Sequence, residues 1–120
     1  MGDGGVVLQN RDASGLAVAV TGAGWKCMVA HRAPVQKFCA DESDPAAEEG
    51  SCQSEVTEQP TGRDTAGFDA SDWPFATVHS ECAVSPKDGY DRIAWDRSAD
   101  LIWGPDLEIE NTTLCRLVVE

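Results

Sequence analysis

Short apolar segments recur along the chain, and several of them alternate or are rich in β-branched residues. Such segments predict strands where turn residues flank them, and no long amphipathic helix is expected. In chain order, strands are expected at 6–10, 16–20, 25–30, 75–80 and 112–120, with shorter ones at 92–95 and 101–103. The segment 16–20, "LAVAV", alternates large and small apolar residues, so we expect it to pack on both faces. The pattern therefore predicts an all-β protein.

The stretch 41–67 interrupts this pattern as a long acidic loop with a single large apolar residue, Val56. Such a composition forms no core of its own, and a loop of this length is usually functional or flexible. A helical turn is expected at "DPAAEE", with Asp44 as its N-cap and Pro45 at the first helical position. Solvated positions are expected for the carboxylates of Glu48, Glu49, Glu55 and Glu58.

The length of 120 residues predicts one domain over 1–120, with residues 1–5 as a linker. Hydrophobic residues make up 42% of the chain, which is a globular proportion. Several short strands joined by Gly/Pro turns favour an all-β sandwich or jelly roll. The first residues, "MGDGG", contain neither a basic nor an apolar region, so no signal peptide is expected there.

Net charge narrows the range of partners. The chain carries 21 acidic and 9 basic residues, which gives a net charge of −12. Binding to nucleic acid or to an anionic membrane surface needs a basic face, so neither is expected. No segment reaches the roughly 18 apolar residues of a membrane span, so membrane insertion is not expected either. The charge favours solubility and weak cation binding.

Five cysteines are widely spaced along the chain: Cys27, Cys39, Cys52, Cys82 and Cys115. None of them forms a Cys-x-x-Cys pair, which disfavours a zinc site. We expect an oxidised, secreted protein with two disulfides and one remaining thiol. A Cys39–Cys52 bond is the first choice for a local disulfide, because it would close the first half of the acidic loop. The sequon at Asn111 fits a secreted, glycosylated protein.

Four motifs in a fixed order give the chain a resemblance to a known family. It reads Trp25-Lys26-Cys27, then "FDASDWPFA" from Phe68, "ADLIWGPD" from Ala99 and "NTTLCRLVV" from Asn111. This order resembles the galactose-binding-like β-sandwich domains over residues 22–118. Those domains occur as non-catalytic modules of glycoside hydrolases and of cell-surface proteins. The chain departs from the family in its longer acidic loop and in "LIW", which stands where the family has "WIW".

The resemblance implies a two-sheet, largely antiparallel β-sandwich, or jelly roll. Such domains bind carbohydrate or mediate cell-surface adhesion, and they frequently hold a structural calcium ion. If the strands around Cys27 and Cys115 pair or face each other, a disulfide between them would close a loop of almost the whole chain. Cys82 would then be the free thiol. We expect a monomeric module of a longer protein, whose partner is a glycan or a component of the cell surface or matrix.

The segment "GYDRIAWDRSAD" is the candidate ligand site. An aromatic ring can cover the apolar face of a sugar while charged groups bind its hydroxyls. The expected ligand residues are Tyr90, Asp91, Arg92, Trp95, Asp96 and Arg97. The alternative is that Trp95 only covers one end of the sandwich. Core positions are expected for Trp25, Trp73 and Trp103, with sugar stacking as the alternative.

The acidic residues in front of Trp73 have two interpretations. Asp69, Ser71 and Asp72 can form a turn through hydrogen bonds to backbone N–H groups. Asp69 and Asp72 can instead be ligands of a calcium ion, which binds several oxygen atoms. A second acidic group of this kind consists of Asp41, Glu42 and Asp44.

Catalytic motifs do not emerge from the sequence. His79 and Cys82 are three residues apart and would lie on opposite faces of a strand, which disfavours a Cys–His nucleophile pair. A nucleophile elbow, a zinc-protease motif and a P-loop are all absent. The sequence therefore predicts a non-catalytic extracellular module that binds a glycan and needs no cofactor, with a structural calcium ion as the one candidate. The alternative is a structural or adhesive domain of the cell surface or matrix, including a mineral-associated one, that acts through its acidic surface. A small hydrolase is the third and least favoured hypothesis.

Overall fold

Seven short strands and a few single helical turns make up the regular structure of residues 4–119, the part of the chain that the computed structural model describes. The strands are β1 (Gln9–Arg11), β2 (Ala17–Val20), β3 (Lys26–Arg32), β4 (Glu55–Val56), β5 (Thr77–His79), β6 (Leu101–Trp103) and β7 (Glu110–Arg116). The helical turns are α1 (Glu81–Val84) and the 3₁₀ helices η1 (Lys37–Asp41), η2 (Gly50–Cys52) and η3 (Tyr90–Arg92). Across these residues, every helix is too short to span a membrane.

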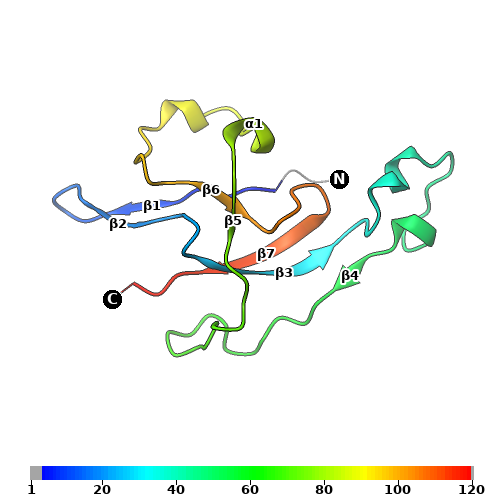
Figure 1. Cartoon of the computed structure of the whole chain (residues 1–120), viewed down its shortest axis with the longest axis horizontal. Helices are drawn as coiled ribbons and strands as arrows, with labels where there is room; N and C mark the ends of the chain where they lie inside the picture. Colours follow the sequence, from blue (N-terminus) through cyan, green and yellow to red (C-terminus); the bar gives the residue numbers. More distant parts are fainter. Residues whose placement is uncertain (1–3, 120) are drawn as a thin grey trace.

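Every strand pairing in this part of the chain is antiparallel, and the pairings form three sheets (Figure 1). β3 lies between β4 and β7 in the central sheet, β1 pairs with β2, and β5 pairs with β6. An isolated bridge between Val6 and Ile102 adds the N-terminal segment beside β6. The prediction of a β-rich, antiparallel protein is confirmed, whereas the closed two-sheet jelly roll stays a prediction.

The core lies where residues 74–79 cross from the central sheet to β6. Cys27 N donates to Pro74 O at 2.8 Å and Ala76 N donates to Trp25 O at 2.8 Å, so this segment first pairs along β3. It then continues as β5 beside β6, and Figure 1 shows it in green crossing the other strands. Around this crossing, the buried core consists of Cys27, Ala76 and Ile102, with Trp25 and Cys115 packed against it.

Two disulfides connect parts of the chain that are distant in sequence. Cys27 and Cys115 are opposite each other in the register of β3 and β7, and their sulfur atoms form a disulfide. Cys39 and Cys52 form the second one. Both bonds were expected from the sequence, and Cys82 is free and exposed on α1. Two disulfides are typical of proteins that fold in an oxidising compartment.

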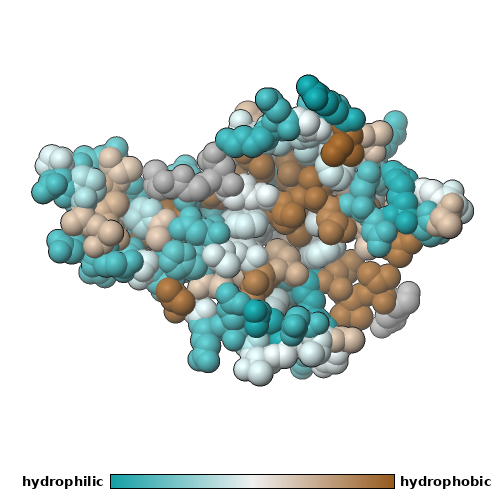
Figure 2. All heavy atoms as spheres, turned by 180° about the vertical axis from the view of Figure 1, so that it is seen from behind, coloured by the Kyte–Doolittle hydropathy of each residue, from teal (hydrophilic) through white to brown (hydrophobic). Residues whose placement is uncertain are grey.

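Residues 33–54, which we call the acidic arm, extend away from the sheets (Figure 1). Seen from behind, the arm is largely hydrophilic, while apolar side chains gather over the body of the molecule (Figure 2). The molecule measures 56 × 35 × 17 Å, and its radius of gyration is 16.5 Å. A compact chain of this length has a radius of gyration of about 14 Å, so both values reflect the extended arm. The helical turn predicted at Asp44 is wrong: residues 44–49 contain no helix, and the 3₁₀ turns η1 and η2 lie on either side of them.

The β1–β2 hairpin differs from its prediction. β1 begins only at Gln9, and β2 is not packed on both faces, because its first two residues are exposed. Leu16, just before β2, is 69% exposed and Val18 is exposed as well. The turn between the two strands is the expected one: the Asp12 carboxylate accepts hydrogen bonds from the N–H groups of Ser14 and Leu16.

Two other expected strands are shorter or missing. Residues 92–95 form no strand, since the indole N–H of Trp95 donates to the carbonyl of Tyr90 and folds the segment back. β7 ends at Arg116, which is opposite Lys26, the first residue of β3. Within the described part of the chain, residues 117–119 therefore have no strand beside them to extend the pairing.

Candidate functional site

A groove of about 490 Å³ lies along β3, and we call it the β3 groove. Its floor includes Met28 and Val29 of β3, and Gly104 with Pro105 closes one end. One wall is the chain from β4 to Pro60, and the other is the segment 72–75. The groove exists because these two segments pair with opposite ends of the same edge of β3 and leave the middle of the strand open.

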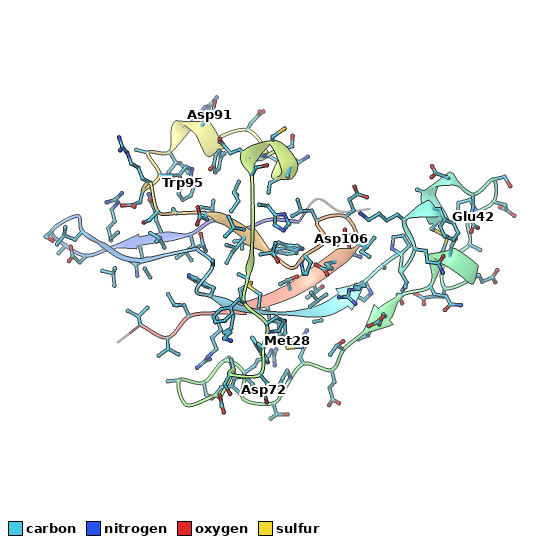
Figure 3. The ribbon with its side chains drawn as sticks, in the orientation of Figure 1. Met28, Glu42, Asp72, Asp91, Trp95 and Asp106 are labelled. Carbon is cyan, nitrogen blue, oxygen red and sulfur yellow. A yellow bond between two sulfur atoms is a disulfide. The ribbon has the colours of Figure 1, made fainter. Side chains whose placement is uncertain are left out.

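Hydrogen bonds fix both walls on β3. On one side, Thr57 N donates to Ala30 O at 2.8 Å, next to the pairing of β4 with His31 and Arg32. On the other side, the bonds of the 74–76 segment to Trp25 and Cys27 hold the second wall. Figure 3 shows Met28 and Asp72 close together on this side of the molecule.

Two aromatic side chains line the second wall. Phe75 is 64% exposed, and the ammonium of Lys26 lies 3.7 Å from the centroid of its ring. Trp73 is half-buried, and its ring centroid is 5.5 Å from that of Phe68 at an interplanar angle of 56°. The guanidinium of Arg116 covers Phe68 from the end of β7. The groove therefore presents aromatic surface on a wall that is anchored to the sheet.

The turn in front of Trp73 separates the two aspartates that were predicted as metal ligands. The carboxylate of Asp69 accepts a hydrogen bond from Ser71 N at 2.9 Å, which holds the pKa of Asp69 below its usual value. Trp73 N in turn donates to Ala70 O. Asp72 lines the groove instead. Within residues 4–119, no group of three or more His, Cys, Asp or Glu side chains is placed to hold a metal ion.

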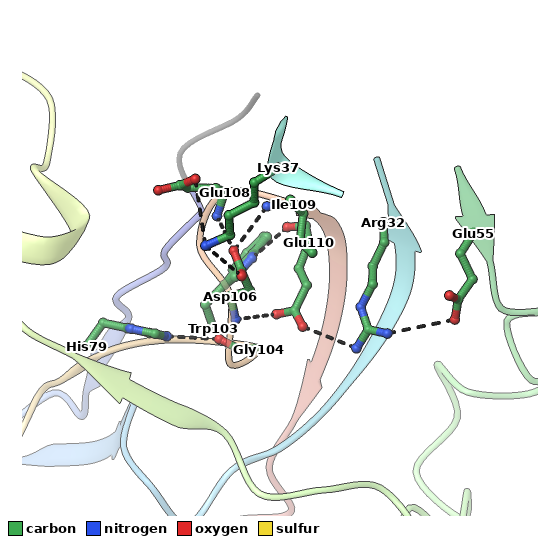
Figure 4. A network of polar contacts seen from close by, with 10 residues as sticks. All are labelled: Arg32, Lys37, Glu55, His79, Trp103, Gly104, Asp106, Glu108, Ile109 and Glu110. Carbon is green, nitrogen blue, oxygen red and sulfur yellow. Dashed lines mark hydrogen bonds and ion pairs between the residues drawn. The ribbon is translucent and has the colours of Figure 1, made fainter. Parts of the chain in front are cut away.

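Arg32 enters the groove with its charge balanced by the protein (Figure 4). Its guanidinium lies 3.3 Å from a carboxylate oxygen of Glu110 and 3.8 Å from one of Glu55. Glu110 is only 3% exposed, and its other oxygen accepts from Asp106 N at 2.8 Å. A side chain at Gly104 would collide with this carboxylate, so only glycine fits there. The buried Glu110 thus fixes the position of Arg32.

The same polar network joins the acidic arm to the sheets (Figure 4). Lys37 Nζ lies 3.0 Å from a carboxylate oxygen of Asp106 and 3.7 Å from one of Glu108. The hydrogen bond to Asp106 raises the pKa of Lys37. Burial alone would raise the pKa of Asp106, but the Lys37 ammonium and the backbone N–H groups of Glu108 and Ile109 bring it below its usual value.

Trp103 and His79 also belong to this network rather than to the core. The indole N–H of Trp103 donates to Glu110 O at 2.8 Å, and Trp103 is half-buried. His79 Nε2 donates to Gly104 O at 2.9 Å. Cys82, which lies on α1 rather than on a strand, is exposed. The faces predicted for His79 and Cys82 on a common strand are therefore wrong.

The predicted ligand platform lies on the other side of the sheets, where Figure 3 shows Trp95 and Asp91. The structure does bring Tyr90 and Trp95 together: their rings stack with centroids 5.6 Å apart and planes at 27°. Each ring thus covers a face of the other. Burial raises the pKa of Tyr90, and the negative charge of Glu81 raises it further.

Of the charged residues predicted in the platform, Asp96 is held by contacts within the protein, whereas the others are exposed. Asp96 is held by Ser98, whose hydroxyl and backbone N–H donate to its carboxylate and lower its pKa, and by an ion pair with Arg11 at 3.8 Å. The remaining predicted ligands are exposed: Asp91, Arg92 and Arg97. Asn111 of the sequon is exposed too, and its side-chain N–H donates to Ala33 O at 2.9 Å.

Sequence reasoning did not assign the β3 groove. Trp73 was expected in the core, Glu58 was expected in a solvated loop, and Arg32 and Phe75 were given no role as ligands. A partial signal was present, because "FDASDWPFA" supplies Asp72 and the two aromatic residues of one wall. The other wall depends on the pairing of β4 with β3, which no local pattern predicts.

Comparison with protein-family models, with curated proteins and with solved structures finds no match for this chain. The resemblance to the galactose-binding-like domains therefore stays a prediction from the four motifs.

Proposed function

We propose that the protein is a non-catalytic extracellular module of the galactose-binding-like type, and that it binds a glycan in the β3 groove. The observation that carries this proposal is the wall of the groove, where Trp73 and the exposed Phe75 stand beside Asp72. Aromatic rings that are next to polar groups in an open groove suit a sugar, because the rings cover its C–H faces and the polar groups bind its hydroxyls. The antiparallel strands and the two disulfides support this class of module.

The groove is favoured over the Tyr90–Trp95 platform for a geometric reason. In the platform, the two rings cover each other, and the Trp95 N–H is already bonded to a backbone carbonyl. In the groove, Phe75 keeps most of its surface exposed. A ligand would therefore gain more contact with aromatic carbon in the groove than on the platform.

A second candidate function is adhesion through the acidic arm without a sugar pocket. It is favoured by one observation: every residue from 41 to 50 is exposed, and five of them are acidic. Such a surface would bind cationic or mineral surfaces and would respond strongly to salt.

A glycan array, run with and without EDTA, separates the two functions. We expect binding to a defined set of glycans, followed by a loss of affinity of about tenfold in Phe75→Ala or Trp73→Ala. Trp95→Ala is the matched aromatic control on the other side of the molecule, and it should bind as the unchanged protein does. A loss in Trp95→Ala alone would move the site to the platform. If no glycan binds and salt-sensitive adhesion remains, the second function holds instead. A loss of binding in EDTA would reveal a calcium requirement.

A further inference from the structure

Carboxylates outnumber cations in the β3 groove. Glu55, Glu58 and Asp72 line it, against the guanidinium of Arg32 and the imidazole of His31. That guanidinium is already paired with Glu110, which is buried beneath it, and with Glu55 at its side. The guanidinium therefore has little charge left for an acidic ligand, and the ammonium of Lys26 is held over the ring of Phe75.

Glu58 and Asp72 are the carboxylates without partners. Among residues 4–119, neither side chain has a hydrogen bond or an ion pair. They stand on different walls, Glu58 in the chain that follows β4 and Asp72 in front of Trp73. A ligand in the groove would thus meet an unpaired negative charge on either side.

The chain itself shows how this wall receives a cation. The ammonium of Lys26 lies 3.7 Å from the ring centroid of Phe75, which is an attractive cation–π arrangement. Aromatic faces combined with free carboxylates are the chemistry that recognises an ammonium group, because both attract positive charge while the rings also pack against carbon.

We propose that the β3 groove selects glycans that carry protonated amines, such as unacetylated glucosamine units. Glu58 and Asp72 pair with the amines, and Trp73 and Phe75 cover the faces of the sugar rings. This inference rests on the proposed glycan function and adds to it the class of sugar.

The test compares two oligosaccharides of equal length, one of glucosamine and one of N-acetylglucosamine, by calorimetry at about pH 6, where the sugar amines carry protons and carboxylates are ionised. They share a backbone, but only the first is charged. We expect the glucosamine oligosaccharide to bind about tenfold more tightly, as two exposed charge pairs would provide. The preference should shrink at about 1 M salt, where charges are screened beyond about 3 Å.

Matched variants locate the effect. In the double variant E58Q and D72N, the preference for the glucosamine oligosaccharide should vanish, because the two unpaired carboxylates are gone. The control is the double variant D44N and E49Q, which removes the same charge from exposed positions of the acidic arm and should keep the preference. An equal loss in the control would mean that the whole acidic surface attracts the amines, and it would overturn the groove as the site.

The remaining outcomes separate this inference from the proposed function. Equal binding of both oligosaccharides, or tighter binding of the acetylated one, would overturn the amine selectivity and leave the glycan function intact. If neither binds and the glycan array is also silent, both proposals are overturned.

Discussion

The body of sheets and the acidic arm each contain one disulfide, but the two bonds have different surroundings. In the body, Cys27 is 3% exposed and packs with Ala76 and Ile102. In the arm, the residues between η1 and η2 are all exposed, and Figure 2 shows that the arm is mostly hydrophilic. The arm meets the sheets through a few polar contacts, among them the ion pairs of Lys37 and the hydrogen bond from Ala33 N to Ile109 O.

The two disulfides therefore stabilise their regions in different ways. The body has a small core, and small cores leave a domain only marginally stable. There the disulfide adds to burial, since it joins two paired strands. The arm buries almost no apolar surface, so its disulfide replaces burial as the constraint on the chain. The body should therefore unfold as one unit, while the arm should open on its own.

Loss of the Cys27–Cys115 disulfide should have the largest effect on stability. The bond closes a loop of 88 residues, and the chain-entropy estimate for such a loop is about 4–5 kcal/mol. We expect the double variant C27A and C115A to lose about this much free energy of unfolding, measured by urea or thermal denaturation. If the variant does not fold, partial reduction of the unchanged protein gives the same comparison.

The matched control is the double variant C39A and C52A. Its loop spans 13 residues, which corresponds to at most about 3 kcal/mol. Because the arm is mostly exposed, we expect most of this loss to be local: faster hydrogen exchange and proteolysis in the arm, with a smaller shift of the global transition. A larger global loss than in the first variant would contradict the division into body and arm.

The second prediction concerns the buried carboxylate at the boundary of the two regions. Glu110→Gln removes the charge that faces Arg32 and weakens the bond from Asp106 N. We expect the free energy of unfolding to fall by about 2 kcal/mol, because a buried group loses a charged partner. Glu55→Gln is the control: its pair with Arg32 is exposed and 3.8 Å long, so the change should stay within about 0.5 kcal/mol. Equal effects would mean that the burial of Glu110 is unimportant.

The sequence predicted the body better than the arm, and the reason is physical. The segments around β3, β5, β6 and β7 carry alternating or β-branched residues. One core joins them, through Cys27, Ala76, Ile102 and Cys115. In these segments, the hydrophobic pattern of the sequence and the contacts in the folded protein favour the same strands. The hairpin segment 16–20 has the same alternation, but no sheet covers it, and composition alone cannot reveal that. In the arm, residues 41–50 are all exposed, so an N-cap signal at Asp44 had no buried contact to support it.

The site was predicted only in part for a related reason. "FDASDWPFA" was recognised as an unusual cluster, and one wall of the groove comes from it. The other wall comes from residues that pair with β3 across a separation of more than twenty positions, and sequence periodicity says nothing about such pairings. Tyr90 and Trp95 were correctly expected to lie together, but their spacing could not show that each ring would cover the other.

The third prediction tests the ion pairs that join the two regions. Asp106 has a lowered pKa, so its contribution to stability is complete above the unfolded value of 3.8 and is lost as the pH falls through the lower folded value. Lys37 has a raised pKa, so its contribution is complete below 10.5 and is lost as the pH rises through the higher folded value. Between these limits, we expect no change in how tightly the arm is held.

Hydrogen exchange, corrected for intrinsic rates, measures this contact. The arm should exchange progressively faster as the pH falls from about 6 to well below 3.8, because Asp106 then takes up a proton and loses its ion pair. In Lys37→Met, the arm should exchange at the faster rate already at about pH 6, and acid should add little. The amides of β3 serve as the internal reference and should respond much less. Equal acid sensitivity in β3 and in the arm would show that the arm is part of the cooperative body.

The smallest effect is expected within the arm itself. The carboxylate of Glu48 accepts hydrogen bonds from the hydroxyl and the N–H of Ser54, and these bonds lower the pKa of Glu48. Glu48→Gln weakens them at an exposed position, so the global melting temperature should stay within about 2 °C. Exchange at Ser54 N should nonetheless increase, since its acceptor has lost its charge. A clear drop in the melting temperature would mean that the end of the arm supports the sheets. It would contradict the view that the arm is held by its own disulfide and by the contacts of Lys37.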